Sequence, residues 1–468
     1  MRTLMWFRND LRVDDNPALY DACAHGDVIA VFCLCNRQWR SHDVGDNRFA
    51  FLLDSLHALA GDLHGLGIPL RLVTEPWFDG VAGRLVNVAQ SVQADALTFN
   101  EEYPLNERVR DSRVRRAFEV AGMAVTSHHG GTLQPPGTVL TNAGEPYTVF
   151  TPFKRRWLDQ CHGSVLDPLP RPRRQRRPAI EDSALPEQTD GVQRDRVAQQ
   201  WPGGRREAQR RLDDFIDNRA VAYQEDRDFP AIDGTSSLSP YLSVGSISAR
   251  TCLHAAFQAN DGRLHGGNAG LSNWISELIW RDFYRHVTAH FPHVSRGQAF
   301  RREFDALPWR HAPGELEAWQ AGRTGYPLVD AAMRQLNETG WMHNRLRMVS
   351  AMFLSKHLLL DWRLGERYFM EQLVDGDFAA NNGGWQWSAS TGTDAAPYFR
   401  IFNPFTQATR FDPEGTFVRR YVPELAEAPT RAVLNPVKYP VNGYPAPIVD
   451  HKMARQRALD SFKALQGG

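Results

Sequence analysis

The stretch DGDFAANNGGWQWSASTGTDAAPYFRIFNP, residues 375–404, carries more information than any other part of the chain. Two aspartates flank a glycine, two asparagines precede a glycine pair, and Trp385 and Trp387 stand one residue apart. Glycine lowers helix propensity, and Asn and Asp side chains compete for backbone hydrogen bonds, so we expect neither an ordinary helix nor a strand here. These residue types suit a planar, hydrogen-bonding cofactor beside a group that stacks on indole. The competing interpretation is a polar turn before a tryptophan-bearing core helix.

The composition is that of a folded globular protein without a charge bias. The 468 residues suffice for two or three domains, and 42% of them are hydrophobic. Lys+Arg and Asp+Glu both number 54, so a nucleic-acid surface must come from local clustering of charge. The five cysteines form no CxxC pair and no ligand-spaced cluster, which predicts reduced thiols and no metal site. Early charges at the N-terminus and the lack of a long apolar run predict a cytoplasmic protein with no membrane partner.

The first part of the chain, 1–130, alternates short apolar runs with amphipathic stretches. The apolar runs are Thr3–Phe7, Val28–Cys35, Pro69–Val73, Ala96–Phe99 and Met123–Thr126. This alternation predicts an α/β domain, a doubly wound, Rossmann-like parallel sheet covered by helices. The segment after the first strand reads WFRNDLRVDDNPAL instead of GxGxxG, which argues against a nicotinamide-dependent dehydrogenase.

Two further regions follow this domain. Residues 131–204 are rich in proline and like charges, with PLPRPRRQRRP at 168–178, and predict an irregular interdomain connector. Its arginines either contact DNA phosphates or belong to a solvated linker. From 205 to 468 the pattern is helical and predicts an all-α domain; the clearest segments are Ser272–His290, Pro327–Thr339 and Met342–Leu360.

Three more segments place chemically active side chains on predicted helices. In YQEDRDFPAIDGTSSLSPYLSVGSIS (223–248), hydroxyl side chains precede a helical run, where they can cap it and leave N–H groups for phosphate oxygens. In NWISELIWRDFYRH (273–286) a carboxylate and an indole three positions apart share a helix face. In TGWMHNRLRMVSAMFL (339–354) an amide and a thioether four apart do the same. A bare cap and solvated helix faces are the alternatives for each segment alone.

Together with 375–404, these segments resemble the photolyase/cryptochrome family, in the version carried by bacterial class I cyclobutane pyrimidine dimer photolyases. The resemblance covers nearly the full length and implies an antenna-binding α/β domain at 1–130, a connector at 131–204 and a helical FAD- and DNA-binding domain at 205–468. It implies a monomeric, light-driven lyase (a deoxyribodipyrimidine photo-lyase), in which reduced FAD donates an electron to a flipped dimer in DNA and splits it into two pyrimidines. The alternative is a cryptochrome, a flavin blue-light photoreceptor that signals through a partner.

The resemblance also implies a set of FAD-binding residues. Asn381 is placed opposite the flavin N5, where its amide can both donate and accept a hydrogen bond. Arg347 is expected to pair with Asp375 beside the ring. Relatives often carry a basic residue where this chain has Ser237. The full implied set is Tyr223, Thr235, Ser236, Ser237, Leu238, Ser239, Trp274, Arg281, Arg347, Asp375, Gly376, Asp377 and Asn381.

A second implied set faces the DNA. Trp280 and Trp387 form the lesion pocket, and Glu277, Asn344 and Met348 join Asn381 as catalytic residues. The DNA-contacting set is Arg227, Glu277, Trp280, Tyr284, Asn344, Arg345, Trp387 and Arg400. Relatives that repair (6-4) photoproducts usually carry histidine at both positions matching Asn344 and Met348, because that reaction needs a proton donor. This chain is therefore expected to repair cyclobutane dimers only.

Two smaller groups complete the resemblance. Trp385, Trp362 and Trp309 match an electron-transfer chain between the flavin and the surface. Asn106, Glu107 and Arg296 match the pocket of a 5,10-methenyltetrahydrofolate antenna, although relatives often have Cys-Lys where this chain has Ser-Arg at 295–296.

Overall fold

The structure, a computed structural model, describes residues 1–161 and 166–466 and divides into two compact units. Unit 1 comprises the described residues of Met1–Val221, Ser236–Pro292 and Val374–Gly376. Unit 2 comprises Ala222–Thr235, His293–Leu373 and 377–466. Residues 162–165, part of the predicted connector, lie outside the described residues. The predicted domain boundaries at 130 and 204 stay a prediction.

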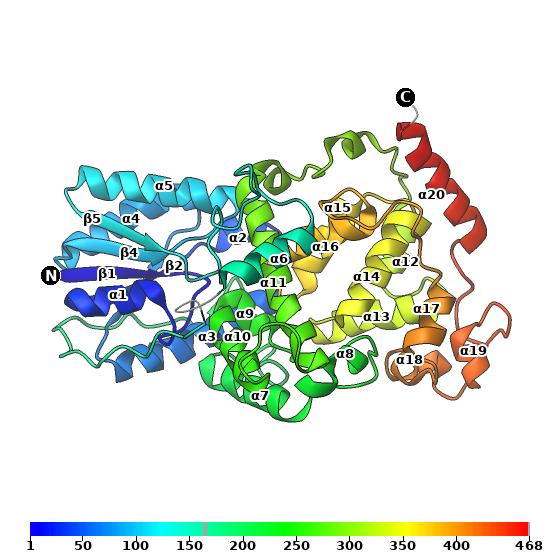
Figure 1. Ribbon diagram of the computed structural model, residues 1–468, viewed down its shortest axis with the longest axis horizontal. Coiled ribbons are helices and arrows are strands. Elements are labelled where there is room, and N and C mark those ends of the chain that lie inside the picture. Colours follow the sequence, from blue (N-terminus) through cyan, green and yellow to red (C-terminus); the bar gives the residue numbers. More distant parts are fainter. Residues whose placement is uncertain (162–165, 467–468) are drawn as a thin grey trace. The chain divides into compact units, whose positions relative to one another are not determined.

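Unit 1 contains a five-stranded parallel sheet in the order β3-β2-β1-β4-β5 (Figure 1). The strands are β1 (Arg2–Phe7), β2 (Asp27–Leu34), β3 (Leu70–Thr74), β4 (Ala96–Asn100) and β5 (Ala124–His128). In the central register, Leu4 pairs with Ile29 on one side and with Leu97 on the other. The predicted doubly wound α/β sheet is therefore confirmed, and each strand lies within one or two residues of its predicted range.

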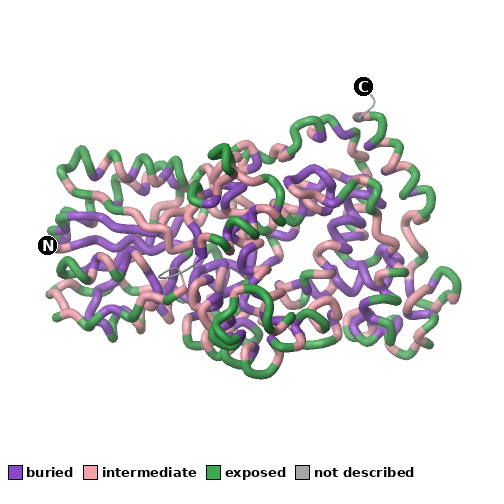
Figure 2. Tube along the Cα trace, viewed as in Figure 1, coloured by how far each residue is buried: buried purple, intermediate pink, exposed green. Residues whose placement is uncertain are grey.

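Helices lie on both faces of this sheet (Figure 1). On one face, α4 (Phe78–Ser91) and α5 (Leu105–Val120) share a core with the strands; its members include Leu4, Trp6, Ile29, Val81, Leu97 and Phe118. On the other face lie α1 (Pro17–His25) and α3 (Asp46–Gly65), and the short α2 (Asn36–Ser41) follows β2. The central strands are buried almost throughout (Figure 2), which is why they read as continuous apolar runs.

The connector is more ordered than predicted. The prediction of an irregular connector is wrong in two places. One is the helix α6 (Phe150–Gln160), and the other is the small hairpin of β6 (Gln188–Thr189) and β7 (Val192–Gln193). The helix α6 forms despite its proline because Phe150, Phe153 and Trp157 recur at helical spacing and are buried on one face. The Arg-rich stretch 168–178 is irregular, as predicted.

The remaining elements are helical, which confirms the predicted helical C-terminal part. Unit 1 also contains α7 (Arg205–Asn218), α9 (Ser239–Val244), α10 (Ala249–Ala259) and α11 (Ala269–His290), and η2 (Ala220–Ala222) follows α7. Unit 2 is built from α8 (Tyr223–Asp226), η3 (Pro292–Arg296), η4 (Arg302–Ala306), α12 (Pro313–Gln320), α13 (Pro327–Thr339), α14 (Asn344–Met352), η5 (Phe353–His357), α15 (Trp362–Gln372), α16 (Phe378–Ala389), α17 (Pro404–Phe411), α18 (Thr416–Tyr421), η6 (Pro423–Leu425), α19 (Thr430–Leu434) and α20 (His451–Gln466).

Two predicted segments differ from the structure. The helix expected over Met342–Leu360 is α14 followed by the π-helical turn η5. The expectation that 375–404 avoids an ordinary helix is wrong for its first half, most of which forms α16. Asp377 caps α16 by accepting a hydrogen bond from Ala380 N at 3.0 Å, and Ser390 ends it in the left-handed conformation.

The core of unit 2 gathers around α13, α14, α15 and α16. Its buried members include Trp319, Leu346, Trp362 and Trp385. Among the described residues, no helix is both long and apolar enough to cross a membrane.

Candidate active site

The helix α11 carries the proposed lesion-contacting residues of unit 1. Glu277, Trp280 and Tyr284 are half-buried, at positions that recur every three or four residues, so they lie on one side of the helix. The Trp280 ring stacks on Phe150 of α6, with ring centroids 3.6 Å apart and planes 8° apart. The sequence therefore placed Glu277 and Trp280 correctly on one face, but it missed Phe150, which belongs to the predicted connector.

Other residues of α11 fix neighbouring segments of unit 1. Arg281 donates hydrogen bonds to Gly131 O at 2.8 Å and Leu242 O at 3.1 Å. Trp274 is 4% exposed and packs against Phe215, with ring centroids 4.9 Å apart. Two of the predicted FAD-binding residues thus lie on α11 and contact neighbouring segments of unit 1.

The buried carboxylate of Asp282 was also missed. It is fully buried and accepts hydrogen bonds from Leu133 N, Gln134 N and Trp157 Nε1 at 2.9–3.1 Å. Three donors satisfy a charge that would otherwise be costly to bury. A single Asp within a helical pattern gives no sequence signal for this role, because its partners lie 125 to 149 residues earlier.

The hydroxyl-rich segment 235–239 has a different conformation from the one predicted. The N-cap of α9 is Leu238, and no side chain caps that helix, so the predicted Ser/Thr cap is wrong. Instead, Ser237 adopts a left-handed conformation (φ 51°) and the following Leu238 is right-handed (φ −90°, ψ −6°). Successive residues of opposite hand turn their N–H groups toward one concavity, which suits an anion such as a phosphate.

The helix α14 presents the second group of predicted lesion residues, in unit 2. Asn344 is exposed and Met348, one turn later, is half-buried. Between them, Arg345 forms a bidentate ion pair with Asp228, at 2.7 and 3.3 Å, and its guanidinium lies 4.6 Å from the Phe411 ring centroid. The predicted DNA contact of Arg345 stays a prediction, and a DNA phosphate would meet an arginine that already has a carboxylate partner.

His343 directly precedes these residues. It is 2% exposed and caps α14 by accepting a hydrogen bond from Arg345 N. Burial lowers its pKa to about 4, so its imidazole carries no added proton at neutral pH.

The orientation of Asn381 on α16 is fixed by a neighbouring helix. Its Nδ2 donates to Glu366 O of α15 at 3.0 Å, and Asn382 Nδ2 donates to the Glu366 carboxylate at 2.7 Å. With Nδ2 turned to α15, no donor among the described residues reaches Asn381 Oδ1. The amide therefore offers an acceptor oxygen, which fits a protonated ring nitrogen.

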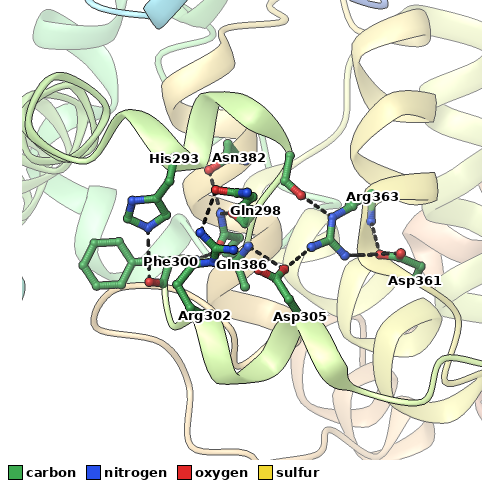
Figure 3. A network of polar contacts seen from close by, with 11 residues as sticks. His293, Gln298, Phe300, Arg302, Asp305, Asp361, Arg363, Asn382 and Gln386 are labelled. Carbon is green, nitrogen blue, oxygen red and sulfur yellow. Dashed lines mark hydrogen bonds and ion pairs between the residues drawn. The ribbon is translucent and has the colours of Figure 1, made fainter.

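A polar network that includes Asn382 and Gln386 also anchors α16 (Figure 3). Gln386 is buried; it accepts a hydrogen bond from Phe300 N at 2.7 Å and donates to Asn382 Oδ1 at 2.9 Å. Nearby, Arg363 pairs with Asp305 at 2.5 Å and with Asp361 at 3.1 Å, which ties η4 to the start of α15 (Figure 3). These contacts hold the helix that carries Asn381 and Trp387 against the 297–305 segment.

The three tryptophans predicted to carry electrons belong to one core in unit 2. Trp385 and Trp362 are buried, and Trp309 is partly buried and packs against the same core. Their indole N–H groups are all buried without a hydrogen-bond acceptor among the described residues. Trp319 is a fourth indole in this core, and its ring contacts Trp385 at 6.0 Å. The three tryptophans of the predicted electron-transfer chain therefore all lie in or against the same core. Their role in electron transfer stays a prediction.

The predicted antenna residues of unit 1 begin α5. Asn106 is exposed and donates a hydrogen bond to His42 Nε2 at 2.8 Å. Burial, together with the charge of Glu102, raises the pKa of Glu107 to about 7. Arg296, in unit 2, is exposed at the end of η3. The antenna pocket and the Arg347–Asp375 pair stay predictions, as do the contacts of Arg400, which is exposed.

Comparisons with known proteins agree over the whole chain. The family model described as DNA photolyase matches residues 3–173, and the one described as FAD binding domain of DNA photolyase matches 274–464. The chain is 44% identical over 473 residues to the deoxyribodipyrimidine photo-lyase of Escherichia coli (strain K12) and 43% identical over 472 residues to that of Salmonella typhimurium, with 99% of each chain covered. It is also similar to the crystal structure of a bacterial class III photolyase from Agrobacterium tumefaciens, with a TM-score of 0.90 and 36% identity, covering 100% of this chain and 98% of that one.

Proposed function

The chain belongs to the DNA photolyase family, and from this premise we propose that it repairs DNA in a light-dependent reaction, splitting cyclobutane pyrimidine dimers into two pyrimidines. The observation that carries the proposal is the aromatic wall of α11, where a half-buried Trp280 with one face backed by Phe150 stands one turn from Glu277. Such a wall suits a planar base that has left the DNA stack. The photoreceptor alternative has less support, because the curated relatives of nearly full length are photo-lyases.

The cofactor of the reaction is FAD. When bound in its reduced form, FAD would supply the electron that opens the cyclobutane ring after light is absorbed, and would take that electron back once the ring has split into two neutral pyrimidines. The residues present fit this group: the opposed conformations of Ser237 and Leu238 suit a diphosphate, and the Asn381 oxygen suits a ring N–H. We assign the remaining contacts to the predicted set, with Tyr223, Trp274 and Arg281 among them.

The balance of energies favours a flipped lesion. Extruding a base from the duplex costs a few kcal/mol, and less for a damaged base. Stacking on an aromatic side chain returns roughly 1–3 kcal/mol per base. Trp280 and Trp387, both half-buried, are therefore sufficient to offset extrusion in a chain with no net positive charge.

The polar residues have orienting roles in this proposal. Glu277 bonds the pyrimidine edge, Asn344 contacts the lesion from the exposed start of α14, and Met348 packs beside it. Ring opening by electron transfer needs no net protonation, and neither an amide nor a thioether supplies a proton. Buried His343 is neutral and adds none.

Three aspects of the proposal rest on the family resemblance alone. We propose that 5,10-methenyltetrahydrofolate serves as the antenna through Asn106, Glu107 and Arg296, and that the chain acts as a monomer on chromosomal DNA in the cytoplasm. Arg227, Arg345 and Arg400 are the proposed phosphate contacts.

The experiment that tests the function uses purified holoprotein reduced with dithionite. An oligonucleotide with one thymine–thymine cyclobutane dimer is incubated with the protein in blue light or in the dark, and restored thymines are counted by chromatography. We expect restoration in the light and none in the dark. Binding of flavin without restoration in the light would refute the proposal in favour of the photoreceptor.

A further inference from the structure

The stacked pair of Phe150 and Trp280 joins two segments that are distant in sequence. Phe150 begins α6 and Trp280 lies in the middle of α11, both in unit 1. A centroid separation of 3.6 Å with planes 8° apart leaves little room for lateral offset, so the two rings overlap almost fully. Isolated aromatic pairs prefer an offset or edge-to-face arrangement. The surrounding structure must therefore hold this geometry.

Polar contacts between α6 and α11 supply that constraint. Trp157 Nε1 donates to Asp282 at 3.1 Å, and Lys154 Nζ donates to Ser276 Oγ at 2.6 Å. These bonds lie on both sides of Trp280 along α11. Phe283 adds an apolar contact, because its ring packs edge-on against both members of the pair, at 5.8 Å from Phe150 and 5.6 Å from Trp280.

The two side chains of the stacked pair differ in their exposure to solvent. Phe150 is 8% exposed, whereas Trp280 is half-buried. Phe150 thus covers one face of the indole, Phe283 and Tyr284 contact its ring at centroid distances of 5.6 and 5.5 Å, and the remainder of the half-buried ring is exposed. Without these neighbours, the indole could rotate about its two side-chain bonds and would have to be ordered when a base stacks on it, which weakens binding.

We infer that Phe150 is a positioning residue for lesion recognition: it backs Trp280, so that a damaged pyrimidine stacks on an indole already held in place. The inference rests on the proposed function, which gives Trp280 its contact with the lesion. It assigns part of the recognition apparatus to the segment matched by the first family model (3–173), which contains Phe150, whereas Trp280 lies in the segment matched by the second (274–464).

Phe153 provides a matched control on the same helix. It is 1% exposed and packs against Phe283 and His286 of α11, with ring centroids 5.2 and 5.0 Å apart, but it makes no ring contact with Trp280 among the described residues. Substitution of either phenylalanine by leucine removes a buried ring from the α6–α11 contact. Only Phe150→Leu removes the backing of Trp280.

The test measures dissociation constants of the holoprotein, in the dark, for a duplex with one thymine dimer and for the same duplex undamaged. Phe150→Leu should weaken binding to the damaged duplex about tenfold, equivalent to 1.4 kcal/mol, and leave undamaged DNA unaffected. Phe153→Leu should change neither constant by more than about twofold, and Phe150→Tyr, which keeps the ring, should retain wild-type affinity. In a Trp280→Leu background, Phe150→Leu should cause no further loss.

Several outcomes would overturn the inference: wild-type affinity of Phe150→Leu for the damaged duplex, an equal loss in Phe153→Leu, or a loss in Phe150→Tyr as large as in the leucine variant. Thermal melts check that each variant is folded; if Phe150→Leu is not, Phe150→Met takes its place and the same outcomes apply. Failure of the proposed function is a separate result, because wild-type protein would then bind both duplexes equally.

Discussion

Replacing Trp309 by phenylalanine is expected to slow the light-driven reduction of oxidised flavin at least about tenfold, as for a barrier raised by roughly 1.4 kcal/mol. A benzene ring gives up an electron far less readily than an indole. Trp309 is the partly buried member of the proposed chain, and Trp362 and Trp385 are buried in the core that it packs against. Repair by protein that has been reduced chemically beforehand should be unchanged, because these tryptophans act outside the repair cycle. Absorbance of the bound flavin during illumination with dithiothreitol measures the first rate.

Trp319 offers the matched control for this prediction. It is a fully buried indole of the same core and contacts the Trp385 ring at 6.0 Å, but it is not part of the proposed chain. Trp319→Phe should leave the rate of photoreduction within about twofold of wild type. A residue outside the electron-transfer chain should change the activation free energy of photoreduction by less than about 1 kcal/mol. Equal loss of photoreduction and repair in Trp309→Phe, or a larger slowing in Trp319→Phe, would contradict the assignment.

Adding one methyl group at Gly365 is expected to destabilise the protein by about 1–3 kcal/mol. At this position α15 approaches α16 so closely that a Cβ atom would overlap the Trp385 ring and lie 2.6 Å from Leu354 Cδ2. Trp385 is 2% exposed and cannot move aside without displacing other core side chains. The free energy of unfolding from urea titration of the holoprotein measures the effect of Gly365→Ala.

Gly384, in the neighbouring helix α16, has the opposite expectation. A Cβ atom there would meet no atom within 4 Å, and the residue is exposed. Gly384→Ala should therefore stabilise the protein by about 0.5–1 kcal/mol, because alanine loses less conformational freedom in a helix. A similar loss of stability in both variants would show that the close approach at Gly365 is not the cause.

The part of the fold that was predictable has a strong local pattern. The three central strands are buried almost throughout, so each appears in the sequence as an apolar run, as at Ala96–Phe99. Helix faces were also predictable, because residues three or four positions apart share a face of a helix. Glu277 and Trp280 lie on α11, and Asn344 and Met348 lie on α14, at these spacings.

The parts that were missed depend on contacts between distant segments. The helix α16 has poor intrinsic propensity, yet Gln386 bonds to Phe300, 86 residues earlier, and Trp385 fills a gap that a glycine in α15 leaves open. The helix α6 lies in a proline-rich region, and its Trp157 bonds to Asp282, 125 residues later. Local propensity contains no information about such partners, so tertiary packing overrode it.

The account's central claim is that this chain repairs cyclobutane dimers by electron transfer without a histidine proton donor at the positions of Asn344 and Met348. Its most direct test exposes the reduced holoprotein, in blue light, to two oligonucleotides that differ only in carrying a thymine–thymine cyclobutane dimer or a (6-4) photoproduct. Asn344 and Met348 cannot donate the proton that the (6-4) reaction needs, and the lowered pKa of His343 keeps that neighbour neutral. Counting restored thymines should give repair of the cyclobutane dimer and none of the (6-4) product; repair of the (6-4) product, or an intact cyclobutane dimer, would contradict the claim.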